Sequence, residues 1–324
     1  MALIRFDDFY RIREKLKQGY LSRAVDSIIP FGNRTKRAWN HTAHPPKHWG
    51  SIPRIRQHWN ECISGFQGVG LQEYVAANYP HLKNGAALSI GCGSGSNELL
   101  WAQTGLFGTV QAFDLSPSRI EVANRAYQEG SFPTNVNFSV ASFAQIPEFG
   151  SGFRAVLAEN ALHHSRDLQN TIESLCRCLR PGGLLILRDF VGPSRFQWTD
   201  EQLSLTKTLL AEIPKELRTR WKSNSPKERH FTPGTLSMML SDPSEAAQSS
   251  NILPLLKRKF DQVELKPLGG TLLQLVFDDI AHHFIGDSEK ALDIVERCIR
   301  TESRLIQKGQ LKSDFVFGIF RRPE

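Results

Sequence analysis

The stretch from residue 86 to residue 98, AALSIGCGSGSNE, constrains the fold of this chain more than any other. A short apolar run ends in three glycines at alternate positions, Gly91, Gly93 and Gly95, and an apolar helical pattern follows at once. Glycine tolerates positive φ and leaves no Cβ in the way of a ligand, and the first N–H groups of a helix are free to donate. The pattern predicts a strand, a glycine turn and a helix, which form either a ligand site or a plain connection.

A second apolar run closes on an acid 19 positions after Gly95, at Asp114. A carboxylate at the end of the neighbouring parallel strand can accept hydrogen bonds from the ribose hydroxyls of a nucleoside. Asp114 therefore favours a ligand site and leaves two cofactors in competition, a nicotinamide dinucleotide and S-adenosylmethionine. The dinucleotide pattern expects a third glycine or alanine at position 96, where this chain has Ser96.

The middle of the chain alternates between strand and helix patterns, which predicts a parallel, doubly wound sheet. Strands are expected at residues 86–90, 109–113, 136–140, 155–158 and 184–187, and helices at 54–63, 71–79, 118–129 and 168–179. Beyond residue 190 we expect helices at 200–212, 214–221, 233–240, 244–258, 272–284 and 288–307, and strands at 262–265 and 314–320. Thr199 and Gln202 have the spacing of a capping box at the start of the first of these helices.

The segment LRPGGLLIL, residues 179–187, decides between the two cofactors. Together with the glycine turn and Asp114, it resembles the class I S-adenosylmethionine-dependent methyltransferases, in their type 11/12 small-molecule form. The resemblance covers residues 86–190 closely and the final strands loosely. It implies an α/β fold with a doubly wound, mostly parallel seven-stranded Rossmann-like sheet, an N-terminal helical lid, and helical insertions after strands 5 and 6.

Four parts are expected from this resemblance and from the composition along the chain. They are a basic helical arm and lid (1–80), the cofactor-binding core (81–190), a helical substrate cap (191–258), and the final strands with a helical insertion (259–324).

The resemblance also implies a set of cofactor residues. The glycine turn cradles the methionine and ribose parts, Asp114 binds the ribose hydroxyls, and Leu115 flanks the adenine. Where the family usually has an aspartate for the adenine amino group, this chain has Ser142, followed by Phe143 as a substitute contact. The expected cofactor residues are Gly91, Cys92, Gly93, Ser94, Gly95, Asp114, Leu115, Ser142, Phe143, Glu159 and Asn160.

Two adjacent histidines follow the fourth strand, where ligands of parallel sheets bind. His163 or His164 is a candidate general base, and the alternative is that one of them only caps or orients the next helix. Asp189, just past the fifth strand, is a further candidate. Attack on an activated sulfonium needs little beyond alignment, so a reaction without a base stays open.

Residues for the methyl acceptor are expected after the fifth strand. Arg195, Trp198 and His230 are the candidates, with packing of a helical cap as the alternative. No metal site is expected. The histidines at 41, 44 and 48 have no nearby Cys or carboxylate, and His282–His283 after Asp278–Asp279 is interpreted as structural or pocket-lining, on one helix face.

The composition is that of a soluble globular protein, with 40% hydrophobic and 23% charged residues, and no apolar run approaches a membrane span. The N-terminus lacks a signal-peptide pattern, so a cytoplasmic location is expected. Five scattered cysteines argue against a disulfide framework.

The net charge of +7 comes mostly from residues 1–50, which hold ten basic and four acidic side chains. A basic arm rather than a basic cleft argues against nucleic acid. Residues 5–30 are expected to form an amphipathic helix that packs on the main domain or, alternatively, attaches to a membrane surface.

The sequence therefore predicts an enzyme that transfers the methyl group of S-adenosylmethionine to an oxygen or nitrogen of a small or lipid-like metabolite, leaving S-adenosylhomocysteine. One alternative is an RNA or protein methyltransferase that uses the basic arm. Another is a non-catalytic scaffold that only binds the cofactor.

Overall fold

The computed structural model describes residues 8, 48–221, 223, 225–236, 238, 242 and 244–324. Apart from Asp8, the amphipathic helix expected over 5–30 lies outside the described residues, as do the histidines at 41 and 44. The chain divides into two compact units. The sheet unit comprises Ile63–Val191, Ala246–Lys266 and Val316–Glu324, and the helical unit comprises Met1–Cys62, Gly192–Glu245 and Pro267–Phe315. The four-part division expected from the sequence stays a prediction.

A seven-stranded sheet in the order β3-β2-β1-β4-β5-β7-β6 forms the centre of the sheet unit. The pairs of β1 with β2 and β4, of β2 with β3, and of β4 with β5 are all parallel. The strands are β1 (Gly85–Ile90), β2 (Phe107–Asp114), β3 (Asn135–Val140), β4 (Phe153–Glu159), β5 (Leu179–Phe190), β6 (Asp261–Gly269) and β7 (Phe315–Arg321). This confirms the predicted doubly wound, mostly parallel sheet, although β5 begins at Leu179 rather than at residue 184.

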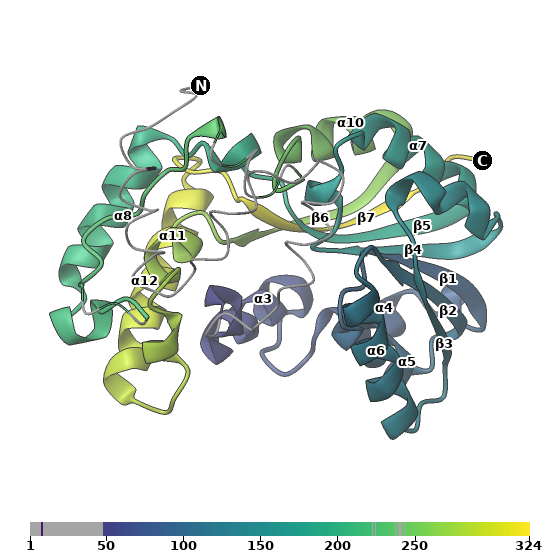
Figure 1. Ribbon diagram of the computed structural model, residues 1–324, viewed down its shortest axis with the longest axis horizontal. Coiled ribbons are helices and arrows are strands. Elements are labelled where there is room, and N and C mark those ends of the chain that lie inside the picture. Colours follow the sequence, from purple (N-terminus) through teal and green to yellow (C-terminus); the bar gives the residue numbers. More distant parts are fainter. Residues whose placement is uncertain are drawn as a thin grey trace. The chain divides into compact units, whose positions relative to one another are not determined.

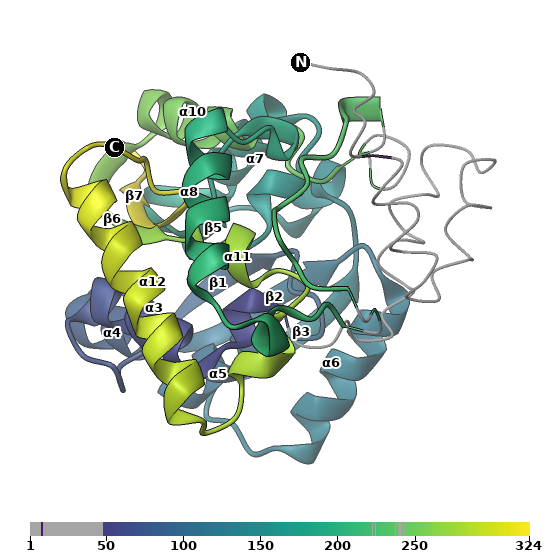
Figure 2. The same ribbon diagram turned by 90° about the vertical axis from the view of Figure 1, so that its left-hand side faces the viewer.

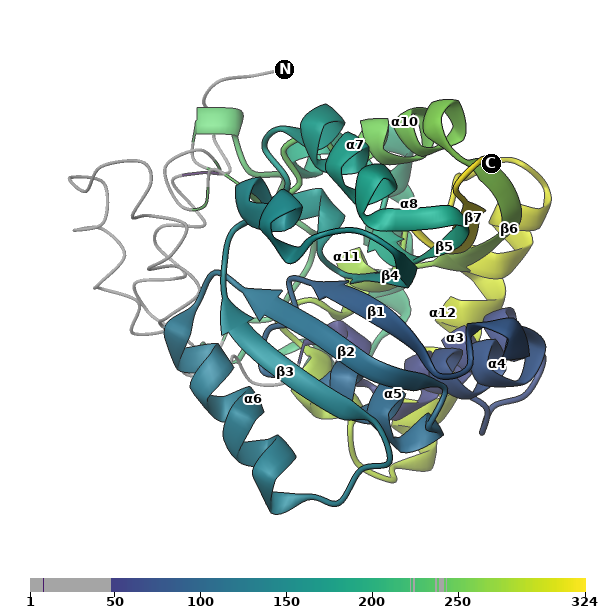
Figure 3. The same ribbon diagram turned by 90° about the vertical axis from the view of Figure 1, so that its right-hand side faces the viewer.

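Helices cover both faces of this sheet (Figures 1 and 3). One face carries α4 (Leu71–Asn78), α5 (Ser96–Thr104) and α6 (Pro117–Glu129), and the other carries α7 (Leu168–Cys178), α10 (Ile252–Lys259) and the 3-10 segment η5 (Phe143–Phe149). Because the central strands are buried on both faces, they read as continuous apolar runs. Leu88, Ile90 and Val156 point into the core cluster that includes Ile172 of α7 and Leu256 of α10.

The helix predicted over 244–258 is wrong in its first half. Residues 244–248 form turns and bends, a 3-10 turn η9 covers Ser249–Asn251, and α10 begins only at Ile252. Pro254 explains the late start, because proline is tolerated in the first turn of a helix, where its missing N–H has no intrahelical partner anyway.

The helical unit contains α8 (Asp200–Glu212), α11 (Leu273–Phe277) and α12 (Glu289–Gln307), of which Figure 2 shows α8 and α12 as the long ones. It also holds α3 (Pro53–Ser64) as far as Cys62. The capping box of α8 is confirmed, since Gln202 N donates to Thr199 Oγ1 at 3.2 Å and Thr199 N donates to Gln202 Oε1 at 2.8 Å.

Two helix predictions in this unit are wrong. Residues 214–221 form only the 3-10 turn η8 (Lys215–Arg218), and the helix expected over 272–284 is broken between α11 and η10 (Ala281–Phe284). The break lies at Asp279, whose φ of 66° is incompatible with a right-handed helix. His282 and His283 therefore do not share a helix face with Asp278. The helix expected over 233–240 lies partly outside the described residues.

Among the described residues, no helix combines the length and the apolar composition that crossing a membrane requires.

Candidate cofactor site

The glycine turn after β1 has the backbone conformation that its sequence predicts. Gly91, Gly93 and Gly95 have φ values of 62°, 56° and 80°. A Cβ on Gly91 would lie 2.9 Å from the Ala161 Cβ, and one on Gly95 would lie 2.8 Å from a side chain of α6. A Cβ on Gly93 would meet only the flexible end of Arg119, at 3.3 Å. Two of the glycines are thus required by packing, whereas Gly93 leaves room for a ligand on the backbone.

Asp114 fastens this turn to the next helix. Its Oδ2 accepts a hydrogen bond from Gly93 N at 3.0 Å, and its Oδ1 accepts one from Ser116 N at 2.9 Å. The side chain is half-buried, as is the adjacent Leu115. Each carboxylate oxygen can accept more than one hydrogen bond, so Asp114 can hold the turn and still bind ligand hydroxyls.

Arg119, in the first turn of α6, is a site residue that the sequence reasoning missed. Burial lowers its pKa, and the neighbouring carboxylate of Asp114 opposes that shift. Its position five residues after Asp114, just inside a helix that begins with Ser-Pro, is the signal that could have revealed it.

A buried carboxyl group lies beneath the glycine turn. Ser89 Oγ donates to Glu98 Oε1 at 2.6 Å, and burial raises the pKa of Glu98 to about 8. Glu98 is in the first turn of α5, and its carboxyl group is predominantly neutral at pH 7. The half-buried Cys92 and Ser94 complete the turn above it.

Phe143 borders the turn on the side of β2. Its ring packs edge-on against Phe113 with centroids 6.2 Å apart, and its edge lies 3.9 Å from where a Cβ on Gly91 would be. Ser142 caps η5: its backbone N–H and its hydroxyl both donate to Gln145 Oε1, at 3.0 and 3.2 Å. Of the two residues expected near the adenine, Phe143 therefore offers a contact surface, while the Ser142 hydroxyl donates within the protein.

The two cofactor candidates at the end of β4, Glu159 and Asn160, differ in their surroundings. The Glu159 carboxylate accepts hydrogen bonds from Trp101 Nε1 at 2.7 Å and Gln72 Nε2 at 3.3 Å, and Arg188 Nη2 lies 2.9 Å away. Only 4% of the Glu159 side chain is exposed, so its contacts are internal and brace α4 and α5. Asn160 is exposed with a φ of 54°, and its backbone N–H donates to the Arg188 carbonyl at 2.7 Å.

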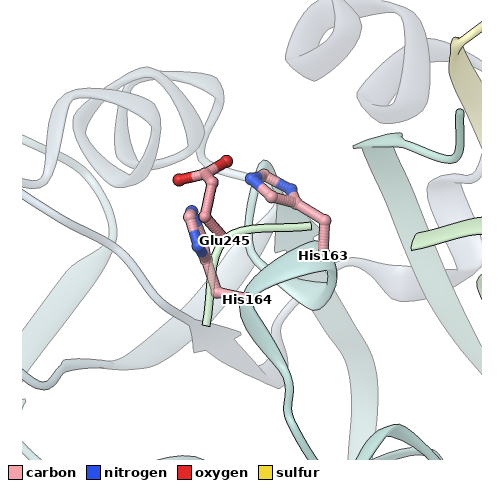
Figure 4. A group of neighbouring side chains, drawn as sticks. All are labelled: His163, His164 and Glu245. Atoms are coloured by element: carbon pink, nitrogen blue, oxygen red, sulfur yellow. The ribbon is translucent and has the colours of Figure 1, made fainter. Parts of the chain in front are cut away.

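Asp189, expected just past the fifth strand, lies within β5 and organises the turn that follows β4. It is fully buried, and its Oδ2 accepts hydrogen bonds from Ala161 N at 3.1 Å and Leu162 N at 2.7 Å. Its Oδ1 contacts Nδ1 of His163. Figure 4 shows His163 and His164 next to each other on the 3-10 turn η6 (Leu162–His164), with ring centroids 4.0 Å apart.

The two histidines have different electrostatic surroundings. The Asp189 carboxylate beside Nδ1 of His163 favours the tautomer with its proton on Nδ1, and it favours an added positive charge on the ring. Burial, reinforced by the charge of Arg119 and by the charge that His163 carries when it is protonated, holds the pKa of His164 well below its usual range. Of the pair, His163 has the surroundings of a base, and His164 those of a neutral neighbour.

The three acceptor candidates lie in the helical unit. The buried Trp198 stacks on Phe196, with centroids 5.2 Å apart, and His230 packs edge-on against the indole at 4.7 Å. Arg195 Nη1 donates to the Glu245 carbonyl at 3.2 Å. Arg195 and Phe196 both adopt left-handed φ values, 56° and 52°. The structure brings Trp198 and His230 together, and their role toward an acceptor stays a prediction.

Comparison with known proteins agrees with this geometry. Residues 88–187 match a family described as a methyltransferase domain. The chain therefore carries a methyltransferase domain over residues 88–187. The 27-O-demethylrifamycin SV methyltransferase of Amycolatopsis mediterranei is 31% identical over 121 residues, which cover 37% of this chain and 44% of that protein. An O-methyltransferase of Pyrenophora dematioidea is 29% identical over 104 residues, covering 32% and 39% respectively.

The chain thus spans less than half the length of either relative. Among solved structures, the phosphoethanolamine N-methyltransferase 2 of Haemonchus contortus in complex with S-adenosyl-L-methionine is 14% identical. Its alignment covers 92% of this chain and 61% of that one, with a TM-score of 0.48.

Proposed function

We propose that this methyltransferase transfers the methyl group of S-adenosylmethionine to an oxygen or nitrogen of a small or lipid-like metabolite, with a hydroxyl oxygen as the preferred acceptor. The observation that carries the proposal is the hydrogen bond between Asp114 and the glycine turn. A carboxylate at the end of β2 holds Gly93, the glycine that leaves its backbone open.

The residues of the turn fit the cofactor chemically. Asp114 retains acceptor capacity for two ribose hydroxyls, and Phe143 and Leu115 offer apolar surface for a purine. The N–H groups of the turn and of the first turn of α5 donate to polar atoms of the methionine part. When bound, S-adenosylmethionine supplies a methyl group on a positively charged sulfur.

His163 is the proposed base. In methyl transfer to a hydroxyl oxygen, bound S-adenosylmethionine would supply the methyl group, and His163 Nε2 would accept the proton that the hydroxyl loses. Asp189 positions the ring and stabilises the imidazolium that results. His164, kept neutral by its surroundings, is proposed as a neighbour that does not exchange the proton.

A base favours an oxygen acceptor over a nitrogen one. A neutral amine attacks with its lone pair before it loses a proton, whereas a hydroxyl becomes a good nucleophile as its proton leaves. Two relatives bear names that point the same way, a 27-O-demethylrifamycin SV methyltransferase and an O-methyltransferase. Arg195, Trp198 and His230 are the proposed acceptor contacts.

The test begins with calorimetry of the full chain with S-adenosylmethionine and S-adenosylhomocysteine. Turnover is then measured as S-adenosylhomocysteine formation with panels of small alcohols and phenols, small amines, RNA and proteins, and products are identified by mass spectrometry. We expect cofactor binding and a methylated hydroxyl compound. Binding without turnover on any panel would favour the scaffold alternative, turnover on RNA or protein alone would favour the alternative that uses the basic arm, and no binding of either cofactor form would overturn the proposal.

A further inference from the structure

Arg188, near the end of β5, is a charged residue that neither the glycine turn nor the pair of His163 and Asp189 uses. Its Nη2 lies 2.9 Å from Glu159 Oε2 and 3.2 Å from Asn97 Oδ1. About a fifth of its side chain is exposed, at 20%, whereas the Glu159 side chain is 4% exposed. The arginine is therefore the member of this ion pair that a ligand can reach.

The fold puts Arg188 beside the glycine turn. It stands in register with Glu159 at the carboxyl end of β4, the edge of a parallel sheet where ligands bind. Glu159 accepts from Trp101 of α5, so the two side chains lie on the face covered by that helix. Asn97 is the second residue of α5, two residues after Gly95.

The hydrogen bonds of Arg188 leave donors for a further partner. Both contacts of its guanidinium group with Glu159 and Asn97 involve Nη2. Within the part of the chain that the structure describes, Nη1 has no hydrogen-bond partner, and it is not among the buried unpartnered atoms. The Glu159 carboxylate already accepts hydrogen bonds from Trp101 and Gln72, so it does not require Nη1 as a further donor.

We propose that Arg188 binds the α-carboxylate of the methionine moiety of the cofactor, an inference that rests on the proposed function. The carboxylate lies at one end of the cofactor and the adenine at the other, with the ribose between them, and Asp114 is the proposed ribose ligand. Arg188 supplies a permanent positive charge near the start of α5, which follows the glycine turn. Charge-assisted hydrogen bonds from a guanidinium to a carboxylate are strong. Glu159 and Asn97 act as positioning residues that hold Nη2, so that Nη1 faces the ligand.

The alternative is that Arg188 only neutralises the buried Glu159. Decarboxylated S-adenosylmethionine separates the two, because it keeps the nucleoside, the sulfonium and the amino group and lacks only the carboxylate. If Arg188 binds the carboxylate, the wild type prefers the complete cofactor by roughly 10- to 100-fold, and Arg188→Met abolishes that preference. Arg188→Lys retains part of it, because a charge without the planar fork remains.

The experiment is calorimetry of both ligands with the wild type, Arg188→Met, Arg188→Lys and Asp114→Asn. Asp114→Asn is the matched control and should weaken both ligands by the same factor. If Arg188→Met leaves Glu159 unpaired and does not fold, the double variant Arg188→Met/Glu159→Gln removes both charges together and gives the same expectation. An unchanged preference in a folded arginine variant overturns the inference alone, whereas a wild type that binds neither ligand overturns the proposed function.

Discussion

The buried carboxylate of Asp189 contacts Nδ1 of His163 with one oxygen and accepts the backbone N–H groups of the preceding turn with the other. One side chain therefore sets both the path of the chain after β4 and the tautomer of the imidazole. This double use couples the position of the His163 ring to the path of the short turn at the edge of the sheet.

If His163 is the base, His163→Ala should lower the rate of methyl transfer by ~10²- to 10⁴-fold and leave the affinity for S-adenosylmethionine nearly unchanged. His164→Ala is the matched control, since its ring is equally close to the turn and is kept neutral. Initial rates of S-adenosylhomocysteine formation with the best acceptor measure both. Equal losses in the two variants would contradict the assignment, and full activity in both would mean that alignment alone carries the reaction.

Asp189→Asn keeps an oxygen for the backbone N–H groups and removes the charge beside His163. The imidazolium is then less stabilised, so the acidic limb of the pH–rate profile should move to lower pH and the plateau should fall. Rates measured between pH 5 and pH 9 check this. A lower plateau with an unmoved limb would show that Asp189 acts only on the structure of the turn.

Asp114→Ala removes two proposed hydrogen bonds to the ribose and two observed ones to the backbone of the turn. Each charge-assisted bond is worth about 1.5–3 kcal/mol, so affinity for both cofactor forms should fall at least about tenfold. Asp114→Asn retains an acceptor and should lose less. Glu121→Gln, on the outer surface of α6 with 73% of its side chain exposed, is the control for calorimetry. Unchanged affinity in Asp114→Ala would mean that other residues hold the ribose.

The sequence predicts the sheet and the glycine turn well because both depend on local patterns. Strand runs, alternating glycines and the acid at the end of β2 are each readable within a few residues. The partners that give the site its electrostatics are distant in the chain. Gln72 reaches Glu159 across 87 positions, and the choice between His163 and His164 depends on Asp189, 26 positions from His163.

Glu159 shows a limit of the rule that ligands bind at the carboxyl ends of parallel strands. The rule places the residue at the ligand edge of the sheet, as observed, but it does not say which face the side chain takes. The carboxylate is on the face of α5, where Trp101 and Arg188 engage it. The broken helix between α11 and η10 is a similar case, since periodicity continues across a residue, Asp279, whose backbone turns left-handed.

Two glycine substitutions should separate folding from binding. Gly95→Ala places a Cβ 2.8 Å from a side chain of α6 at a φ of 80° and should destabilise the fold by roughly 1–3 kcal/mol. Gly93→Ala meets only the mobile end of Arg119, so it should cost about 1 kcal/mol of stability and mainly weaken cofactor binding. Thermal melts and calorimetry on the two variants test this, and a Gly93→Ala protein that binds like the wild type would count against a ligand at that backbone.

Glu98 gives a prediction about stability and pH that requires no acceptor. Its pKa of about 8 in the folded state lies above that of an unfolded glutamate, because the carboxyl group is buried. Between about pH 4.5 and pH 8 the folded protein therefore holds a proton that the unfolded chain has released, and its stability falls as pH rises by up to about 1.4 kcal/mol per pH unit.

Glu98→Gln cannot titrate and keeps an oxygen for the Ser89 hydroxyl. Its free energy of unfolding should therefore fall less between pH 6 and pH 8 than that of the wild type. Urea denaturation at both pH values measures the difference, with Glu121→Gln as the exposed control. If the wild type and Glu98→Gln lose stability in parallel, the Glu98 carboxyl group beneath the glycine turn is ionised in the folded protein. The neutral state assigned to it at pH 7 is then wrong.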